Sequence, residues 1–312
     1  MQSKIDLFSQ LLRELEAEIG TRDVNDLSLR ALQKSIEYLK ANDAQKFCSQ
    51  FKKLLNIISK TEPKFGILIY NFEILNQYFK ENICSKEFNE KKWKRVAIEG
   101  VKNILRKARQ EKSDLIKNST KLKLDGKTIL IHDHSHTVQD VLIHNRRSGQ
   151  KFNVVIAEQD YDKTHSNIER LHKAGIPFQV VPSFMLSHIH ENIDILFFGA
   201  LTLKDSMDFV MDPGTHSIIS EFHVEKIPVY MFINTSKFSL WKSKKRGEIF
   251  IHRHQRKHHS KPIEYERIKY SHDRVPAKLF SKIITDEGVL NPEQLQELYK
   301  TRYNSLRKKN ST

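Results

Sequence analysis

The spacing of apolar residues changes once along the chain, near residue 120, and this change constrains the fold more than any other feature. Up to that point apolar residues recur every three to four positions, as helices require. Beyond it, short apolar runs alternate with stretches of helical periodicity, as in the βαβ units that build a parallel sheet. The sequence therefore predicts an α/β protein in which an all-helical domain (residues 1–120) precedes a domain with a doubly wound parallel sheet (residues 121–312).

The first domain is predicted to contain helices only. Gly20-Thr21 interrupts the first apolar series, and Pro63 suits the first turn of a later helix. The heptads are too irregular for a coiled coil. The predicted helices cover residues 5–19, 29–39, 47–58, 63–79 and 88–116.

The second domain is predicted to alternate strands and helices. The predicted strands cover residues 127–132, 152–157, 177–181, 193–198, 228–233 and 281–288. The predicted helices cover residues 137–145, 164–174, 183–190 and 214–225, with a closing helix from Asn291 and a polar loop over 199–213. Ligands of such sheets bind beyond the carboxyl ends of the strands. A site is therefore expected in the loops at 132–136, 158–162, 183–184, 199–206 and 234–238.

The net charge of +15 is concentrated in one segment. Between residues 242 and 261, eight Lys and Arg residues stand against a single acid, Glu248. This basic insertion is interpreted either as a solvated loop or as a contact surface for nucleic acid or an acidic protein. Aromatic residues for base stacking are sparse in it. The candidate patch residues are Lys244, Lys245, Arg246, Arg253, Arg256 and Lys257.

Several classes of protein and of site lack support in the sequence. The apolar runs are too short for a membrane span, and the N-terminus has no secretory-signal core. The two cysteines, Cys48 and Cys84, lie at no metal-ligand spacing and favour a reducing, cytoplasmic setting. No nucleotide-binding glycine motif occurs, so no cofactor is predicted. The three histidines of residues 132–136 lack distant Cys/His partners, so no metal is predicted.

Seven short motifs of the second domain resemble those of one known family in order and spacing. They include Thr128-Ile-Leu-Ile-His132, Asp194-Ile-Leu-Phe-Phe-Gly-Ala200 and Ile284-Thr-Asp-Glu-Gly-Val289. In these motifs the chain is similar to the alpha, beta and delta regulatory subunits of eukaryotic translation initiation factor 2B. Ribose-1,5-bisphosphate isomerase and methylthioribose-1-phosphate isomerase share that fold. The resemblance implies an N-terminal helical domain followed by a Rossmann-like domain.

The resemblance also implies where an isomerase would carry its catalytic groups. These enzymes use a cysteine after the first strand of the Rossmann-like domain and an aspartate after the Gly-Ala end of a later strand. The corresponding residues here are Asp133 and Leu201. An acid and a base must face the sugar in this reaction. The replacements argue against isomerase chemistry, although Asp133 can still serve as an acid or a base.

Further replacements concern groups that would bind the substrate. Glu62 stands where the family carries an arginine, and Asp212 or Pro213 where it carries a lysine. The helix start at Gly214-Thr215 is interpreted either as an anion site formed by free amides or as a plain helix cap. The residues expected to line a ligand pocket are Glu62, His132, Asp133, Ser135, Glu158, Gly199, Gly214, Thr215 and Lys237.

The function predicted from this resemblance is that of a non-catalytic regulatory or binding protein, like the alpha-type subunit of initiation factor 2B. Pairing as a homodimer or hetero-oligomer is expected through the Rossmann-like domain. The expected partners are subunits of initiation factor 2 or 2B. Two alternatives remain, namely a sugar-phosphate isomerase with a rebuilt site and a nucleic-acid-binding module that uses the basic insertion.

Overall fold

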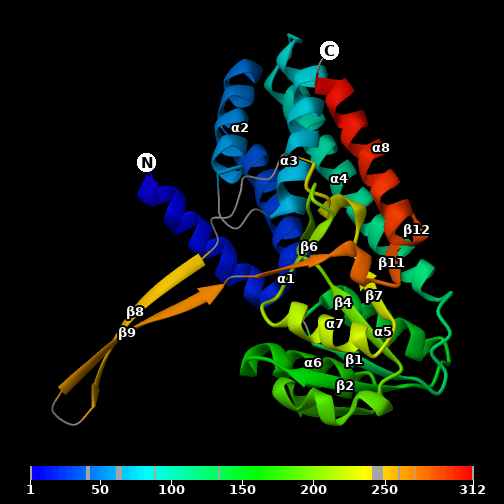
Figure 1. The fold of residues 1–312 in the computed structure, drawn as a ribbon. Helices are drawn as coiled ribbons and strands as arrows, with labels where there is room; N and C mark the ends of the chain where they lie inside the picture. The colour runs from blue at the N-terminus through cyan, green and yellow to red at the C-terminus, as the bar shows by residue number, and fades with distance from the viewer. Residues whose placement is uncertain are drawn as a thin grey trace.

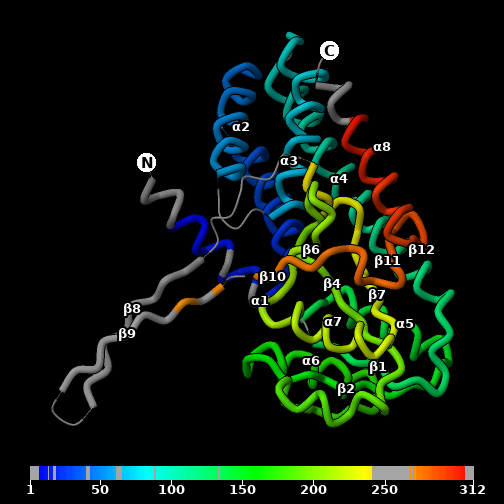
Figure 2. Tube along the Cα trace, in the orientation of Figure 1, coloured from blue at the N-terminus to red at the C-terminus, as the bar shows by residue number. Residues whose placement is uncertain are grey.

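The structure is a computed structural model with side chains (Figure 1). It describes residues 2–39, 43–60, 65–87, 89–132, 134–240, 249–258, 261–270 and 272–310. Figure 2 traces the chain from the helices at its start into the part in which strands and helices alternate. This arrangement confirms the predicted α/β fold with helices first. No helix in the described part of the chain combines the length and the apolar character needed to cross a membrane.

The helices of the first part follow the predicted periodicity. They are α1 (Gln2–Tyr38), α2 (Ala44–Ile58), α3 (Gly66–Phe79), the short π-helical turn η1 (Lys80–Cys84) and α4 (Glu90–Ser119). Asp43 and Asn89 begin α2 and α4, because their side chains accept hydrogen bonds from the free amides of Gln45 and Lys92. Pro63 lies outside the described residues, and α3 begins at Gly66.

A kink at Gly20 divides α1, where the sequence predicts two separate helices. Gly20 has φ 75° and ψ 158°, a backbone conformation that other residues rarely adopt. The predicted break is therefore real, but the helix resumes at once instead of passing through a loop. A Cβ atom at this position would lie 3.3 Å from Nδ1 of His136, in the following α/β part. The kink thus brings both halves of α1 close to the start of the sheet.

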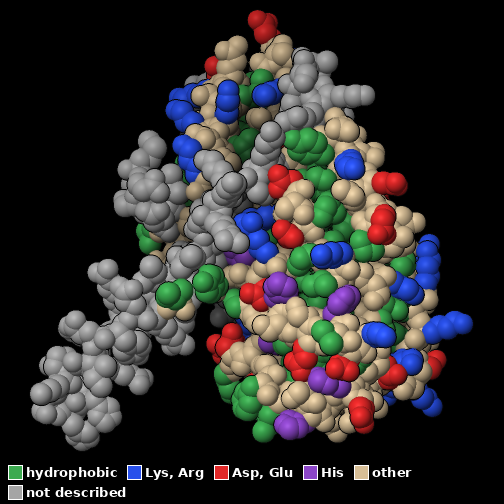
Figure 3. All heavy atoms as spheres, viewed as in Figure 1, with side chains coloured by type: hydrophobic (Ala, Val, Ile, Leu, Met, Phe, Trp, Pro, Cys, Tyr) green, Lys and Arg blue, Asp and Glu red, His purple; other side chains and the backbone are tan. Residues whose placement is uncertain are grey.

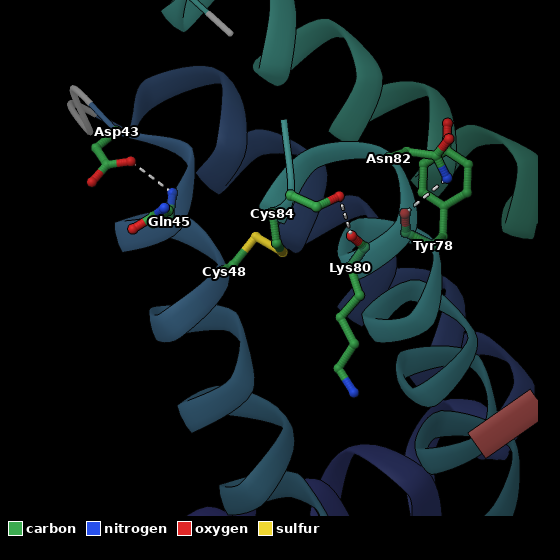
Figure 4. The surroundings of a disulfide bond; sticks show 8 residues. Asp43, Gln45, Cys48, Tyr78, Lys80, Asn82 and Cys84 are labelled. Carbon is green, nitrogen blue, oxygen red and sulfur yellow. Dashed lines mark hydrogen bonds between the residues drawn. A yellow bond between two sulfur atoms is a disulfide. The ribbon is translucent and has the colours of Figure 1, made fainter. Parts of the chain in front are cut away.

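Aromatic rings and one disulfide hold the helical part together. Phe47 of α2 stacks on Trp93 of α4 with ring centroids 4.8 Å apart, and both rings are buried. Cys48 of α2 is bonded to Cys84 of η1 (Figure 4). The sequence favours a reducing setting, in which such a bond is rare. Spacing along the chain does not show that the two cysteines meet, because the distance between them depends on how α2 packs against η1.

The central sheet has seven strands in the order β12-β11-β7-β4-β1-β2-β3. All neighbours are parallel except β11 and β12. The strands are β1 (Thr128–Ile131), β2 (Asn153–Glu158), β3 (Phe178–Pro182), β4 (Ile195–Gly199), β7 (Val229–Phe232), β11 (Lys282–Thr285) and β12 (Gly288–Leu290). The order reverses between β1 and β4, so the loops that follow these strands diverge and leave a crevice.

Helices cover both faces of the sheet, so each strand is apolar on both sides. In β4, Ile195 and Phe197 belong to one core, and Leu196 and Phe198 belong to the other. One face is covered by α4, α5 (His136–Arg147) and α6 (Tyr161–Lys173), and the other by α7 (Thr215–Val224) and α8 (Pro292–Asn310). This is the doubly wound arrangement that the alternating pattern predicts.

Two predicted segments, one loop and one helix, differ from the structure. The polar loop after β4 contains β5 (Thr202–Leu203) and β6 (Asp208–Met211), which form a small sheet with β10 (Asp273–Pro276). The apolar run in β6 is only Phe209-Val210-Met211, too short for periodicity to reveal. The predicted short helix at 183–190 consists of 3₁₀ turns, of which η2 (Ser183–His188) is the first.

The basic insertion is described only in part. Its second half belongs to β8 (Ile249–His258), which pairs antiparallel with β9 (Lys261–Tyr270), so these residues are not the plain loop of one interpretation. Lys244, Lys245 and Arg246 lie outside the described residues. The side chains of Arg253, Arg256 and Lys257 lie outside the description too, and their contact with nucleic acid stays a prediction.

Candidate functional site

Two hollows meet at Lys163, at the carboxyl edge of the sheet. The first, called the Glu16 cavity below, has a volume of about 90 Å³. It lies among the kink of α1 and the loops that follow β1, β4 and β6. Its lining includes Glu16, Thr21, Arg22, His134, Ser135, Lys163, Gly199, Leu201, Asp212 and Lys237.

Glu16 brings a carboxyl group from the first half of α1 into this cavity. Burial raises the pKa of Glu16 to about 7, and the negative charge of Asp212 adds to the effect. Lys163 and Lys237 act in the opposite direction. The carboxyl group therefore changes its charge near neutral pH, whereas an ordinary glutamate is ionised throughout that range.

A second acid in the cavity is already paired. Nζ of Lys163 lies 2.7 Å from Oδ2 of Asp212, and both side chains are mostly buried. Burial lowers the pKa of Lys163, but the adjacent Asp212 outweighs this effect and the net pKa rises. Lys237 donates a hydrogen bond to the carbonyl oxygen of Ala200 at 2.8 Å. With Glu16 ionised, the two acids and two lysines sum to zero charge.

The segment after β1 contributes uncharged groups. Nε2 of His134 lies 2.9 Å from Oγ of Ser166. Burial lowers the pKa of His134 to about 4, and the neighbouring His136 adds to the effect. Ser135 begins α5, where its Oγ accepts a hydrogen bond from the amide of Val138. His134 is thus neutral at physiological pH, and Ser135 is engaged as a helix cap.

A network around Asp140 fixes the wall behind the cavity. Its carboxylate lies 2.9 Å from Arg22, 2.8 Å from Lys112 and 2.8 Å from Arg170. Burial opposes ionisation of Asp140, but these cations hold its pKa below the usual value. The four residues come from α5, α1, α4 and α6, so the network ties both halves of the molecule together.

The second hollow, called the Glu158 groove below, is wider and more open. It has a volume of about 740 Å³. Three acids, Glu158, Asp160 and Glu221, line it together with Lys163. Glu221 lies 2.7 Å from Nε2 of His190. Figure 3 shows His, Asp and Glu side chains over the α6 and α7 surface. The groove is therefore acidic, whereas the cavity is balanced.

His132 and Gly214 form the floor of the groove. His132 is 4% exposed, and burial lowers its pKa. Gly214 precedes α7 with φ 93°, and a Cβ atom there would lie 3.5 Å from Nε2 of His132. Glycine suits this position because other residues rarely adopt its backbone conformation.

The two hollows share out most of the predicted pocket residues, together with Leu201 from the isomerase comparison. The cavity takes Ser135, Gly199, Leu201 and Lys237, and the groove takes His132, Glu158 and Gly214. Thr215 is fully buried at the start of α7 and lines neither. Glu62 and Asp133 lie outside the described residues.

Three charged residues that line the Glu16 cavity were not anticipated from the sequence. Glu16 and Arg22 belong to α1, and Lys163 belongs to the first turns of α6. Each is a charged residue within an amphipathic helix, a pattern that usually indicates a solvated face. No local signal identifies them, because only the packing of α1 against the sheet brings them together.

Metal binding finds no support in the described part of the chain. No group of three or more His, Cys, Asp and Glu side chains there is arranged to hold an ion. The rings of His134 and His136 pack edge to face, with centroids 4.8 Å apart.

Solved structures with the same fold include translation initiation factor eIF-2B of Pyrococcus horikoshii. It has a TM-score of 0.69 and 19% identity, covering 91% of this chain and 97% of that one. A chain of the tetrameric eIF2B beta2-delta2 complex from C. thermophilum has a TM-score of 0.70 and 16% identity, covering 96% and 94%. At such identities the likeness shows the fold alone.

Curated relatives include both kinds of protein expected from the motifs. The eIF2B alpha subunit of Dictyostelium discoideum is 24% identical over 64% of this chain and 66% of its own length. The match to the alpha subunit of Caenorhabditis elegans, also 24% identical, covers 54% of this chain and 56% of the relative, so this chain spans less than two thirds of either subunit. Ribose 1,5-bisphosphate isomerase of Archaeoglobus fulgidus is 22% identical, covering 91% and 89%. A model of the initiation factor 2 subunit family matches residues 20–292, and the chain therefore belongs to that family.

Proposed function

We propose that this protein is a non-catalytic regulatory or binding member of the family, which acts through contacts with the translation initiation machinery as an alpha-type subunit does. Its similarity to two curated alpha subunits supports this role. Because this chain matches only part of the length of those subunits, its having their role is a proposal.

The lining residues and the volume of the Glu16 cavity support this proposal. Leu201, an apolar residue, lines it at the position where the resemblance to isomerases calls for an acid. Asp212 is paired with Lys163 at 2.7 Å. The volume of about 90 Å³ is also far below the roughly 300–1,000 Å³ typical of small-molecule pockets.

The neighbouring groove has the volume for a sugar phosphate but the wrong charge. Three acids and one lysine line it, so a bisphosphate would meet net negative charge. Among the residues that the structure describes, neither hollow thus combines the room and the positive charge for a substrate such as that of the Archaeoglobus enzyme.

The experiment is affinity capture of the tagged full-length chain from its native host. We expect subunits of initiation factor 2 or 2B among the captured proteins. A tag-only bait and an unrelated bait of similar net charge control for retention by the +15 charge. Capture of no initiation factor beyond these controls would reject the role.

We also propose that the chain pairs through its α/β part, as a homodimer or in a hetero-oligomer. The solved relative with beta and delta chains is described as a tetramer, which supports assembly as a family trait. Light scattering coupled to gel filtration checks this, and a monomer at all concentrations would contradict self-association.

An isomerase with a rebuilt site is the second candidate, because one observation favours it. Glu16 is a carboxyl group whose pKa of about 7 suits proton transfer near neutral pH. Turnover of ribose 1,5-bisphosphate that disappears in Glu16→Gln or Asp133→Ala would establish this function. No turnover by the wild-type chain removes it.

A further inference from the structure

We propose that Glu16 determines which ligands the Glu16 cavity admits, and that its carboxylate excludes small oxyanions that the cavity otherwise binds. The exclusion of oxyanions is a property of the cavity itself and requires no protein partner. It assigns a specificity role to a residue of the first half of α1.

The charges around the cavity indicate that Glu16 opposes anion binding. Lys163, Lys237 and Asp212 contribute a surplus of one positive charge, which an ionised Glu16 cancels. Arg22 also lines the cavity, but it is paired with Asp140 at 2.9 Å. Charges interact strongly at a partly buried site, so one added negative charge weakens anion binding considerably.

The position of Glu16 in the chain gives the second argument. The family model matches residues 20–292, so Glu16 lies before the matched region. The remaining lining residues come from the kink at Gly20 onward. The first half of α1 therefore adds a carboxyl group to a cavity that the matched region otherwise builds.

The size and polarity of the cavity define the class of ligand. A volume of about 90 Å³ suits an ion of the size of sulfate or inorganic phosphate. Lysine ammonium groups bind such oxyanions as point charges. Leu201 and Met211 contribute no charge.

The charge of Glu16 also makes admission depend on pH. The titratable and charged groups around it are Asp212 after β6, Lys163 on α6, Lys237 at the end of the 3₁₀ turn η4 (Thr235–Lys237), His134 after β1, His136 at the start of α5, and Arg22 on α1 itself. The pKa of Glu16 is about 7, so Glu16 loses its proton between pH 6 and 8, whereas the pKa of His134 is about 4. We expect tighter oxyanion binding at pH 6 than at pH 8.

The experiment measures sulfate binding to the full chain by isothermal titration calorimetry. Sulfate is used because it keeps its charge of minus two over this pH range. At pH 8, Glu16→Gln is expected to bind sulfate about ten-fold more tightly than wild type, or better. Glu14→Gln, on an exposed position of the same helix, is the matched control and is expected to behave as wild type.

A second pH and two further variants test whether the bound sulfate lies in this cavity. Wild type is expected to approach the sulfate affinity of Glu16→Gln when both are measured at pH 6. The double variant Glu16→Gln/Lys237→Met is expected to bind sulfate no more tightly than wild type. That loss of affinity would place the bound sulfate in the Glu16 cavity. Glu16→Ala repeats the test with a different side chain, and circular dichroism checks that each variant is folded.

Two outcomes would overturn the inference. One is equal sulfate affinity of wild type, Glu16→Gln and Glu16→Ala at pH 8. The other is a gain in affinity that survives Lys237→Met, because sulfate would then be bound elsewhere on a basic protein.

Discussion

The Glu16 cavity and the Glu158 groove lie at the same edge of the same sheet and share Lys163, yet they differ in every property that matters for binding. The cavity is small, partly enclosed and balanced in charge, and its ionisable groups have strongly shifted pKa values. The groove is wide, open and acidic.

The difference shows that the fold supplies a location and the surrounding segments supply the chemistry. The reversal of strand order between β1 and β4 creates the crevice in any sheet of this type. What fills the crevice here is α1, which closes the cavity with Glu16 and Arg22 and leaves the groove uncovered. Four substitutions test this contrast.

The largest effect is expected for Glu16→Gln. The folded-state pKa of about 7 lies above the ordinary 4.5, so folding favours the protonated acid. The contribution to stability is complete below pH 4.5 and is lost as the pH rises to 7. Glu16→Gln should therefore match wild type at pH 4 and be more stable by up to about 3 kcal/mol at pH 8. Urea unfolding at several pH values measures this, and a difference that is independent of pH would refute it.

Asp140→Ala should have the next largest effect. Three cations lose their common partner, which leaves partly buried positive charges next to one another. We expect a loss of about 2 kcal/mol in the free energy of unfolding. Glu99→Ala, which removes the exposed partner of Arg106, serves as the control and should cost about 0.5 kcal/mol or less. Similar losses for both variants would mean that the network does not stabilise the cavity wall.

A smaller effect, opposite in sign to that of Glu16, is expected from His134. Its folded-state pKa of about 4 lies below the ordinary 6.5, so the unfolded chain takes up a proton first as the pH falls. Wild type therefore loses stability between pH 6.5 and 4, and His134→Asn should lose less. The side chain is partly exposed, and solvent screening reduces the expected difference to about 1 kcal/mol. Parallel stability profiles of the two proteins would contradict this.

The smallest effect is expected in the groove. Glu221 and His190 form a pair at 2.7 Å, but the Glu221 side chain is 36% exposed. Glu221→Gln should change stability by less than about 0.5 kcal/mol and the melting temperature by less than about 2 °C. Differential scanning calorimetry measures both quantities. A loss comparable to that of Asp140→Ala would show that the groove is not the solvated surface described above.

Much of the fold was predictable because apolar periodicity reports burial directly. The parallel strands are buried on both faces, so β1, β4 and β7 appear as continuous apolar runs. The strands that were not predicted, β6 and β8, are not continuous apolar runs of this kind. β6 is four residues long, and β8 carries His, Arg or Lys at six of its ten positions, so neither resembles a buried strand.

The site was less predictable, for a different reason. Lys237 and Leu201 follow strands of the sheet, and any doubly wound sheet brings such residues together. Glu16 and Arg22 reach the cavity only because α1 bends at Gly20 and packs across the strand ends. Long-range packing of that kind leaves no trace in local sequence. The resemblance to isomerases pointed to this crevice but not to Glu16, Arg22 and Lys163.

The disulfide between α2 and η1 makes part of the helical half a covalent ring. The two cysteines are 36 residues apart, and the ring includes all of α3. A protease that cuts the backbone inside this ring leaves both fragments attached to each other, so they separate only after a reductant is added. Oxidised chains can therefore be nicked and still keep α2 tethered to the helices that carry the rest of the molecule.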